Sequence, residues 1–242
     1  MLKKLTIFIF CAVFMKIILI FANSSINCWL VNLFLLPLSH YCLHKYVQTM
    51  KILILNASPR AKGNISQMLD VMRIEAESLG AETETVDVNR LNVKPCIACM
   101  KCRKDHRCAL PEDDSQAILQ KIRCCDAIVI GAPCYWGNIP GTLKLLFDRI
   151  VYGMMGETAK GIPVPLHKGK QCILVSTSTT PWPFNIIMHQ SRGAIRAMKE
   201  ICHYSGFKIV ATIEKGGTRH NTAITEKEKR KCIKAVRKLK CT

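Results

Sequence analysis

Four cysteines stand close together near the middle of the chain and are of a type and spacing that could bind metal. Cys96, Cys99, Cys102 and Cys108 belong to a 242-residue chain with fourteen cysteines. Four thiolates at such spacing can hold the irons of a 4Fe-4S cluster or one zinc ion, and they could also stay reduced or redox-active. The pattern differs from a small disulfide scaffold, so in a reducing compartment it favours metal over disulfides.

A second chemically promising stretch, residues 56–66, reads NASPRAKGNIS and joins an apolar run to a helical pattern. Unpaired N–H groups and the positive dipole end of a helix attract phosphate. The hydroxyls of Ser58 and Ser66, the guanidinium of Arg60 and the amide of Asn64 would add donors. Because the stretch lacks both GxGxxG and GxxxxGK, it favours a mononucleotide. The alternative is a plain turn in which Ser58 and Asn64 only cap the helix.

A third stretch, residues 131–141, reads GAPCYWGNIPG and combines aromatic side chains with glycines. Tyr135 and Trp136 suit a flat ring, and flanking glycines let the backbone approach a ligand closely. The alternative is that both aromatic residues form a rim or a subunit contact. The hydroxyl-rich residues 176–183 could reach the same ring, although Ser/Thr/Pro clusters are ordinary loop chemistry.

The elements that must position these stretches follow an alternating pattern of strands and helices. Short apolar runs predict strands buried on both faces of a parallel sheet, and one polar-apolar alternation predicts an edge strand. The predicted strands are residues 52–56, 82–88, 127–132, 172–177 and 207–213. This alternation implies a doubly wound α/β sheet, which places functional loops at the carboxyl ends of the strands.

The helix boundaries have recognisable signals. Apolar residues at three- and four-residue spacing run from Ile65 to Leu79, and Gly80 is placed to end that helix. Pro140 begins another helical segment, where its missing N–H does no harm. Thr225 and Glu228 match a capping box before the last helix.

The chain is strongly basic, with a formal net charge of +18. The surplus lies mainly after residue 49 and favours an anionic partner. Basic residues between 227 and 240 alternate with apolar ones, as on the solvated face of an amphipathic helix. There is no aromatic-studded basic stripe or recognisable nucleic-acid module, so nucleic acid is not a predicted partner.

Residues 1–49 form a hydrophobic N-terminal extension to a domain predicted at residues 50–242, which includes a cysteine-rich loop at 92–110. The apolar run at 5–22 is long enough for one membrane span. Met50 directly precedes the first strand, so a misassigned start is favoured over a real anchor or a soluble extension. The expected location is cytoplasmic, or membrane-anchored and facing the cytoplasm if residues 5–22 are translated.

Three stretches together resemble the NADPH-dependent FMN reductase family, and within it the iron-sulfur flavoproteins: KILILNASPRAKGNIS, the four-cysteine loop and GAPCYWGNIPGTLKLLFDR. The resemblance covers roughly residues 50–213. It implies a flavodoxin-like, doubly wound, five-stranded parallel sheet of order 2-1-3-4-5 with helices on both faces. It also implies bound FMN, association as homodimers or homotetramers, and a 4Fe-4S cluster on the four cysteines, although relatives carry similar loops without a cluster.

The resemblance assigns the FMN-binding residues by position. The phosphate would be held by Ser58, Arg60, Gly63, Asn64 and Ile65. The flavin ring would be lined by Pro133, Cys134, Tyr135, Trp136, Gly137 and Asn138. Where the family often has Thr, this chain has Ile65, so Ser66 is expected to stand in.

The expected function is an FMN-dependent NAD(P)H oxidoreductase acting on a flavin, a quinone or another small acceptor. The alternative is a non-enzymatic iron-sulfur flavoprotein that carries electrons between ferredoxin-like partners. A membrane-attached redox subunit is a third possibility that requires residues 5–22. Because the chemistry would belong largely to the cofactor, no catalytic side chain is expected.

Overall fold

The computed structural model describes residues 49–240. The predicted extension therefore lies outside the described residues, apart from its last residue, and both its membrane anchor and the cytoplasmic location stay predictions. Within residues 49–240, no helix has the length and apolar character needed to cross a bilayer.

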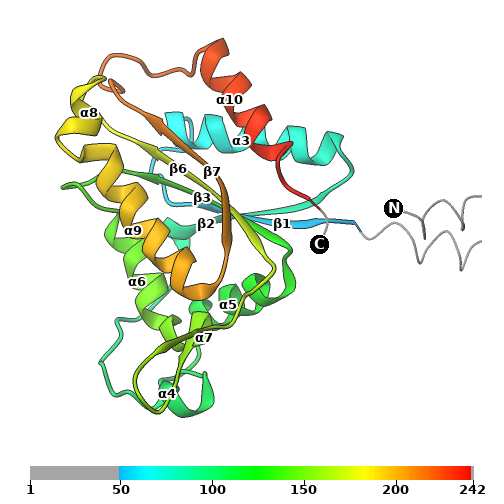
Figure 1. The fold of residues 1–242 in the computed structure, drawn as a ribbon. Coiled ribbons are helices and arrows are strands. Elements are labelled where there is room, and N and C mark those ends of the chain that lie inside the picture. The colour runs from blue at the N-terminus through cyan, green and yellow to red at the C-terminus, as the bar shows by residue number, and fades with distance from the viewer. Residues whose placement is uncertain (1–48, 241–242) are drawn as a thin grey trace, which may run out of the picture. The chain divides into compact units, whose positions relative to one another are not determined.

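A five-stranded parallel sheet forms the centre of the described domain (Figure 1). Its strands are β1 (Lys51–Asn56), β2 (Glu82–Asp87), β3 (Ala127–Pro133), β6 (Gln171–Thr177) and β7 (Lys208–Lys215). They lie in the order β2-β1-β3-β6-β7, and every neighbouring pair is parallel. Because β6 and β7 are the fourth and fifth strands of this sheet, the predicted order 2-1-3-4-5 is confirmed.

Helices cover both faces of the sheet. The long ones are α3 (Asn64–Ser78), α5 (Asp114–Cys124), α6 (Gly141–Arg149), α9 (Gln190–Ser205) and α10 (Glu226–Val236), and the short ones are α4 (Cys102–Asp105), α7 (Val151–Met154) and α8 (Phe184–Ile187). Ile52 and Ile54 pack with α3 and α10, whereas Leu53 and Leu55 pack with α5, α6 and α9. Successive strand residues point to opposite faces, so one apolar run supplies both cores.

The predicted helix boundaries are largely confirmed. Gly80 follows α3 with a left-handed φ of 84°, and Thr225 and Glu228 form a capping box at α10. Pro140 lies at the N-cap of α6. The small antiparallel pair β4 (Met155–Glu157) and β5 (Pro163–Pro165) is not predicted from the sequence, because three-residue strands carry too little periodicity.

Candidate functional site

A cavity of about 320 Å³ lies at the carboxyl edge of the sheet, where the loops after β1, β3 and β6 meet. It is lined by Ser58, Pro59, Arg60, Lys62, Gly63, Asn64, Ile65, Pro133, Cys134, Tyr135, Thr177, Ser178, Thr179, Thr218 and Thr222. Its volume falls in the range of small-molecule sites, roughly 300–1,000 Å³. The register places Asn56 beside Gly131 and Pro133 beside Thr177, so the three strands end at one edge. The structure therefore brings the two predicted loops together and adds the weaker third one.

Asn56, the last residue of β1, holds the following loop in shape, and this role was not predicted from the sequence. The Asn56 Oδ1 accepts the Ser58 N–H at 3.0 Å, and its Nδ2 donates to the Ser66 hydroxyl at 3.0 Å. The Ser66 hydroxyl donates to the Arg60 carbonyl at 2.9 Å. Ser66 is buried and is absent from the lining of the cavity. Its hydroxyl braces the loop from inside.

The N-terminus of α3 is open toward the cavity. Gly63 is the N-cap residue, no side chain caps the helix, and its first turn contains no acidic residue. Ser58 and Asn64 therefore do not cap this helix with their side chains, contrary to that part of the plain-turn alternative. The first N–H groups of a helix have no partner within it, and the dipole adds positive charge there.

The donors around this helix end fit a phosphate monoester. Arg60 and Lys62 line the cavity, and among residues 49–240 no acidic side chain does. Asn64 is 9% exposed, and its Oδ1 has no hydrogen-bond partner in the described part of the chain. A buried acceptor without a partner is costly, and a ribityl hydroxyl would satisfy it. These residues fit the sugar-phosphate part of FMN.

The loop after β3 makes a tight turn at residues 135–138, the Tyr-Trp turn, which divides the residues of the loop between two surfaces. The backbones of Tyr135 and Asn138 exchange hydrogen bonds at 2.9 and 3.0 Å, with Trp136 and Gly137 at the tip in left-handed conformations. Pro133, Cys134 and Tyr135 line the cavity. By contrast, Trp136, Gly137 and Asn138 line an open groove of about 790 Å³ against α9, with the indole fully exposed. The predicted ring-binding set is thus split by the turn.

Cys134 connects this turn to α9. Its thiol donates to the Gln190 carbonyl at 2.8 Å, and burial raises the pKa of the Cys134 thiol. It is therefore a neutral, structurally engaged group beside the cavity. No signal in the sequence distinguished it from its aromatic neighbours.

The four-cysteine loop gathers its thiols in one neighbourhood without forming a metal site. Cys96 and Cys99 are exposed, whereas Cys102 and Cys108 are half-buried. Burial raises the pKa of the Cys102 thiol, and the charges of the other three cysteines raise it further. Among residues 49–240, no three His, Cys, Asp or Glu side chains are arranged to hold a metal ion. The thiols as arranged do not fit a 4Fe-4S cluster or zinc.

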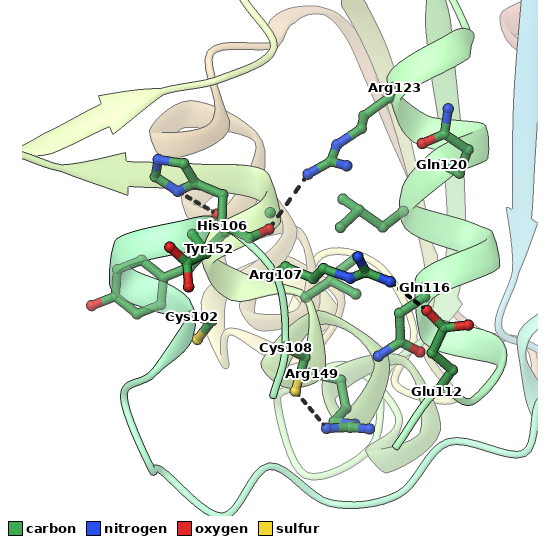
Figure 2. Close-up of a pocket in the computed structure, with 14 residues that line it drawn as sticks. Cys102, His106, Arg107, Cys108, Glu112, Gln116, Gln120, Arg123, Arg149 and Tyr152 are labelled. Carbon is green, nitrogen blue, oxygen red and sulfur yellow. Dashed lines mark hydrogen bonds and ion pairs between the residues drawn. The ribbon is translucent and has the colours of Figure 1, made fainter. Parts of the chain in front are cut away.

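A second cavity, of about 310 Å³, lies against the end of this loop, and Arg149 anchors its wall (Figure 2). The Arg149 side chain is 1% exposed. Its guanidinium donates to the Cys108 Sγ at 2.7 Å, to the Pro111 carbonyl at 3.1 Å and to the Asp113 carboxylate at 2.9 Å. Arg149 ends α6, which begins directly after the Tyr-Trp turn. One helix therefore ties the cysteine loop to the loop beside the first cavity.

Asp113 should make the stability of this region depend on pH. Burial acts to raise its pKa, but hydrogen bonds from Ser115, the Lys94 N–H and Arg149 outweigh burial and lower the pKa to about 2, against 3.8 ordinarily. A depressed carboxyl pKa contributes stability that is complete above the unfolded value and is lost as pH falls through the folded one. We expect a loss of about 2 kcal/mol between pH ~4 and ~2. Denaturant titrations of wild type and Asp113→Asn across this range test it, and equal pH slopes would contradict it.

The chain is similar in sequence to known flavoproteins and oxidoreductases. Residues 50–202 match the model of a family described as NADPH-dependent FMN reductase. A protein named iron-sulfur flavoprotein from Methanosarcina thermophila is 40% identical over 102 residues, which are 42% of this chain and 53% of that protein. The chain thus spans about half the length of this relative. A protein named FMN-dependent NADH:quinone oxidoreductase from Stenotrophomonas maltophilia is 31% identical over 132 residues, 53% and 66% of the two chains.

Solved structures confirm the fold. The FMN-dependent NADH-azoreductase from Bacillus anthracis, crystallised in complex with FMN, matches with a TM-score of 0.59 and 18% identity. The match covers 78% of this chain and 96% of that one. At this identity the likeness establishes the flavodoxin-like architecture alone.

Proposed function

The chain belongs to the NADPH-dependent FMN reductase family, and from that premise we propose that it is an FMN-dependent NAD(P)H oxidoreductase. Its acceptor would be a small molecule such as a flavin or a quinone. One observation carries the proposal: three strand-end loops line a single cavity that has an uncapped helix N-terminus on one loop and Tyr135 on another. The name of the Stenotrophomonas relative supports the same reaction class.

The proposed roles follow the two kinds of surface in the cavity. Arg60, Lys62 and the first turn of α3 bind the phosphate, because they combine positive charge with N–H donors. The Asn64 Nδ2 is already bonded to the Asn221 carbonyl, so the Asn64 side chain would accept from the ribityl chain through its Oδ1. Gly63 keeps the loop compact, since a Cβ there would lie 3.0 Å from the Arg60 Cβ and 3.1 Å from its carbonyl oxygen.

Three residues assigned to the phosphate act indirectly in this proposal. Ile65 packs in the core beneath the loop, where its side chain lies 2.8 Å from the position of a Cβ on Gly131. Ser66 braces the loop through Arg60. Ser58 acts through its hydroxyl, which accepts the Arg60 N–H at 3.2 Å.

The ring is proposed to lie against Pro133, Cys134 and Tyr135, near the hydroxyls of Thr177, Ser178 and Thr179. Trp136, Gly137 and Asn138 would meet the ring or the electron donor from the other side of the turn. Bound FMN supplies the chemistry by accepting a hydride from a reduced nicotinamide and passing electrons to an acceptor. The chain's own part is to bind, orient and shield, and no side chain needs to act as an acid or base.

The test begins with the full chain purified without oxygen. We expect a yellow protein whose flavin absorbance bleaches when NADPH is added. Arg60→Ala should raise the Kd for FMN about tenfold, the effect of losing one hydrogen bond to a charged group, and leave the Kd for riboflavin unchanged. Arg90→Ala, a change at an exposed arginine outside the cavity, is the matched control. A colourless protein that cannot be loaded with FMN would refute the proposal.

A second candidate function is electron carriage with an iron-sulfur cluster. It is favoured by the spacing of the four cysteines and by the name of the Methanosarcina relative. Because the thiols as arranged do not fit a cluster, this function would require the loop to rearrange around the metal. Iron and sulfide assays on anaerobic protein decide it: both elements present, with reduction by a protein donor and not by NADPH, would replace the first proposal.

Association of copies is also proposed. Large apolar side chains are exposed in the Tyr-Trp turn and on or next to α8: Trp136, Trp182, Phe184, Ile187 and Met188. Such a concentration is typical of an interaction surface. A homodimer or homotetramer would cover it, and sedimentation of the full chain measures this.

A further inference from the structure

We propose that residues 216–224, the segment between β7 and α10, form a fourth wall of the cavity and bind the phosphate of the flavin through Thr222. The inference rests on the proposed function. The family match ends at residue 202, so this wall lies beyond the matched region. Thr218 and Thr222 nevertheless line the same cavity as Arg60 and Asn64.

One end of the wall is fixed to the loop after β6. The Gly217 N–H donates to the Thr180 carbonyl at 2.9 Å. The Thr218 N–H and hydroxyl both donate to the Ser178 carbonyl, at 3.1 and 3.0 Å. At Gly216 a Cβ would lie 2.6 Å from the Thr180 oxygen and 2.7 Å from Asn185 Cγ, so the approach is too close for any side chain. Thr218 is therefore a positioning residue, because its hydroxyl is engaged.

The other end is fixed to the first turns of α3. The Asn64 Nδ2 donates to the Asn221 carbonyl at 2.8 Å, and the Gln67 Nε2 donates to the Thr222 carbonyl at 2.8 Å. The Gln67 Oε1 in turn accepts the Ile224 N–H at 3.2 Å. Gln67 also donates to the Lys62 carbonyl at 2.9 Å. The side-chain amides of Asn64 and Gln67 thus join the wall to the loop after β1 and to α3.

A buried ion pair closes the base of the wall. Lys215 is 5% exposed, and its Nζ lies 2.7 Å from Glu228 and 3.3 Å from the Ala223 carbonyl. Glu228 belongs to the capping box of α10. Both ends of residues 216–224 are therefore pinned, and the backbone carrying Thr222 is held against the cavity.

The chemistry of this wall suits an anionic oxygen. Thr222 lines the cavity, where among residues 49–240 no acidic side chain does, and a threonine hydroxyl donates readily to phosphate. Asn64 lines the same cavity; its Nδ2 donates to the wall, and its buried Oδ1 has no hydrogen-bond partner among residues 49–240. Such an acceptor calls for a donor such as a ribityl hydroxyl, which supports a ligand beside the wall and leaves the phosphate to Thr222 and the N–H groups of α3.

The experiment compares FMN with riboflavin, which differ only by the phosphate. The full chain is freed of flavin, and both Kd values are measured by flavin fluorescence. We expect Thr222→Val to raise the Kd for FMN about tenfold and that for riboflavin less than twofold. Thr222→Ser, which keeps the hydroxyl, should restore the wild-type ratio. His220→Ala, in the same segment but outside the lining, is the control.

A second variant tests the clamp without touching the cavity. Gln67→Ala should weaken FMN binding more than riboflavin binding, and it should reduce the protection from hydrogen exchange that FMN confers on residues 216–224. If the ratio of the FMN Kd to the riboflavin Kd stays at its wild-type value in both Thr222→Val and Gln67→Ala, while Arg60→Ala raises it, this inference is overturned and the proposed function stands. A wild-type chain that binds neither flavin would overturn both.

Discussion

Replacing Arg149 by Met is expected to lower the free energy of unfolding by about 3–5 kcal/mol, the cost of removing one partner from a buried ion pair. The Arg149 and Asp113 side chains are 1% and 7% exposed, so the remaining carboxylate would stay buried without its partner. The Cys108 Sγ and the Pro111 carbonyl would lose their donor as well. Met has similar length and adds no polar group, which confines the effect to the lost interactions.

Chemical denaturation of the full chain measures this loss, and two further variants interpret it. Arg73→Met removes an exposed ion pair within α3 and should cost less than about 1 kcal/mol. The double variant Arg149→Met with Asp113→Asn removes both charges and should recover part of the stability, since no unpaired charge remains. A loss no larger than that of Arg73→Met would show that the buried pair contributes little.

The sheet could be predicted from the sequence because its strands are buried on both faces. Residues 128–130 and 172–175 are apolar without interruption, which is the pattern of a central parallel strand. Order and crossover then follow from chain connectivity. Such local reasoning does not separate Cys124, which is exposed, from Cys125 beside it, which is buried. Adjacent positions at the end of a helix point in different directions, and an apolar residue type alone does not fix which one faces the core.

The site was predictable only where its residues follow a strand directly. A loop that directly follows an apolar strand can be recognised in the sequence. The loop at residues 56–66, here the phosphate loop, and the Tyr-Trp turn were therefore predicted. Contacts between distant segments leave no local pattern: Gln67 meets Thr222 across 155 positions, and Arg149 meets Cys108 across 41. The inward direction of Ser66 depends on Asn56, and the division of the Tyr-Trp turn depends on α9. These contacts depend on the tertiary structure, and neither composition nor periodicity predicts them.

The contact between α9 and that turn leads to the second large effect, expected for Gly193→Ala. A Cβ at Gly193 would lie 1.8 Å from the carbonyl oxygen of Gly137 and 2.8 Å from its carbonyl carbon. The obstructing atoms are backbone, within a turn closed by the Tyr135–Asn138 hydrogen bonds, so no side-chain rotation relieves the overlap. We expect destabilisation of about 3 kcal/mol, at the upper end for overpacking, and at least a tenfold loss of FMN affinity.

Gly141→Ala separates this clash from the general effect of alanine in a helix. Gly141 begins α6, and a Cβ there would meet no atom within 4 Å. Alanine in a helix is intrinsically better than glycine by about 1 kcal/mol, so Gly141→Ala should be neutral or stabilising and leave FMN binding intact. That intrinsic gain also works in favour of Gly193→Ala, so any net loss there understates the cost of the overlap. If the two variants changed stability and flavin affinity alike, α9 would not set the position of the turn, and the placement of the ring against Tyr135 would lose its support.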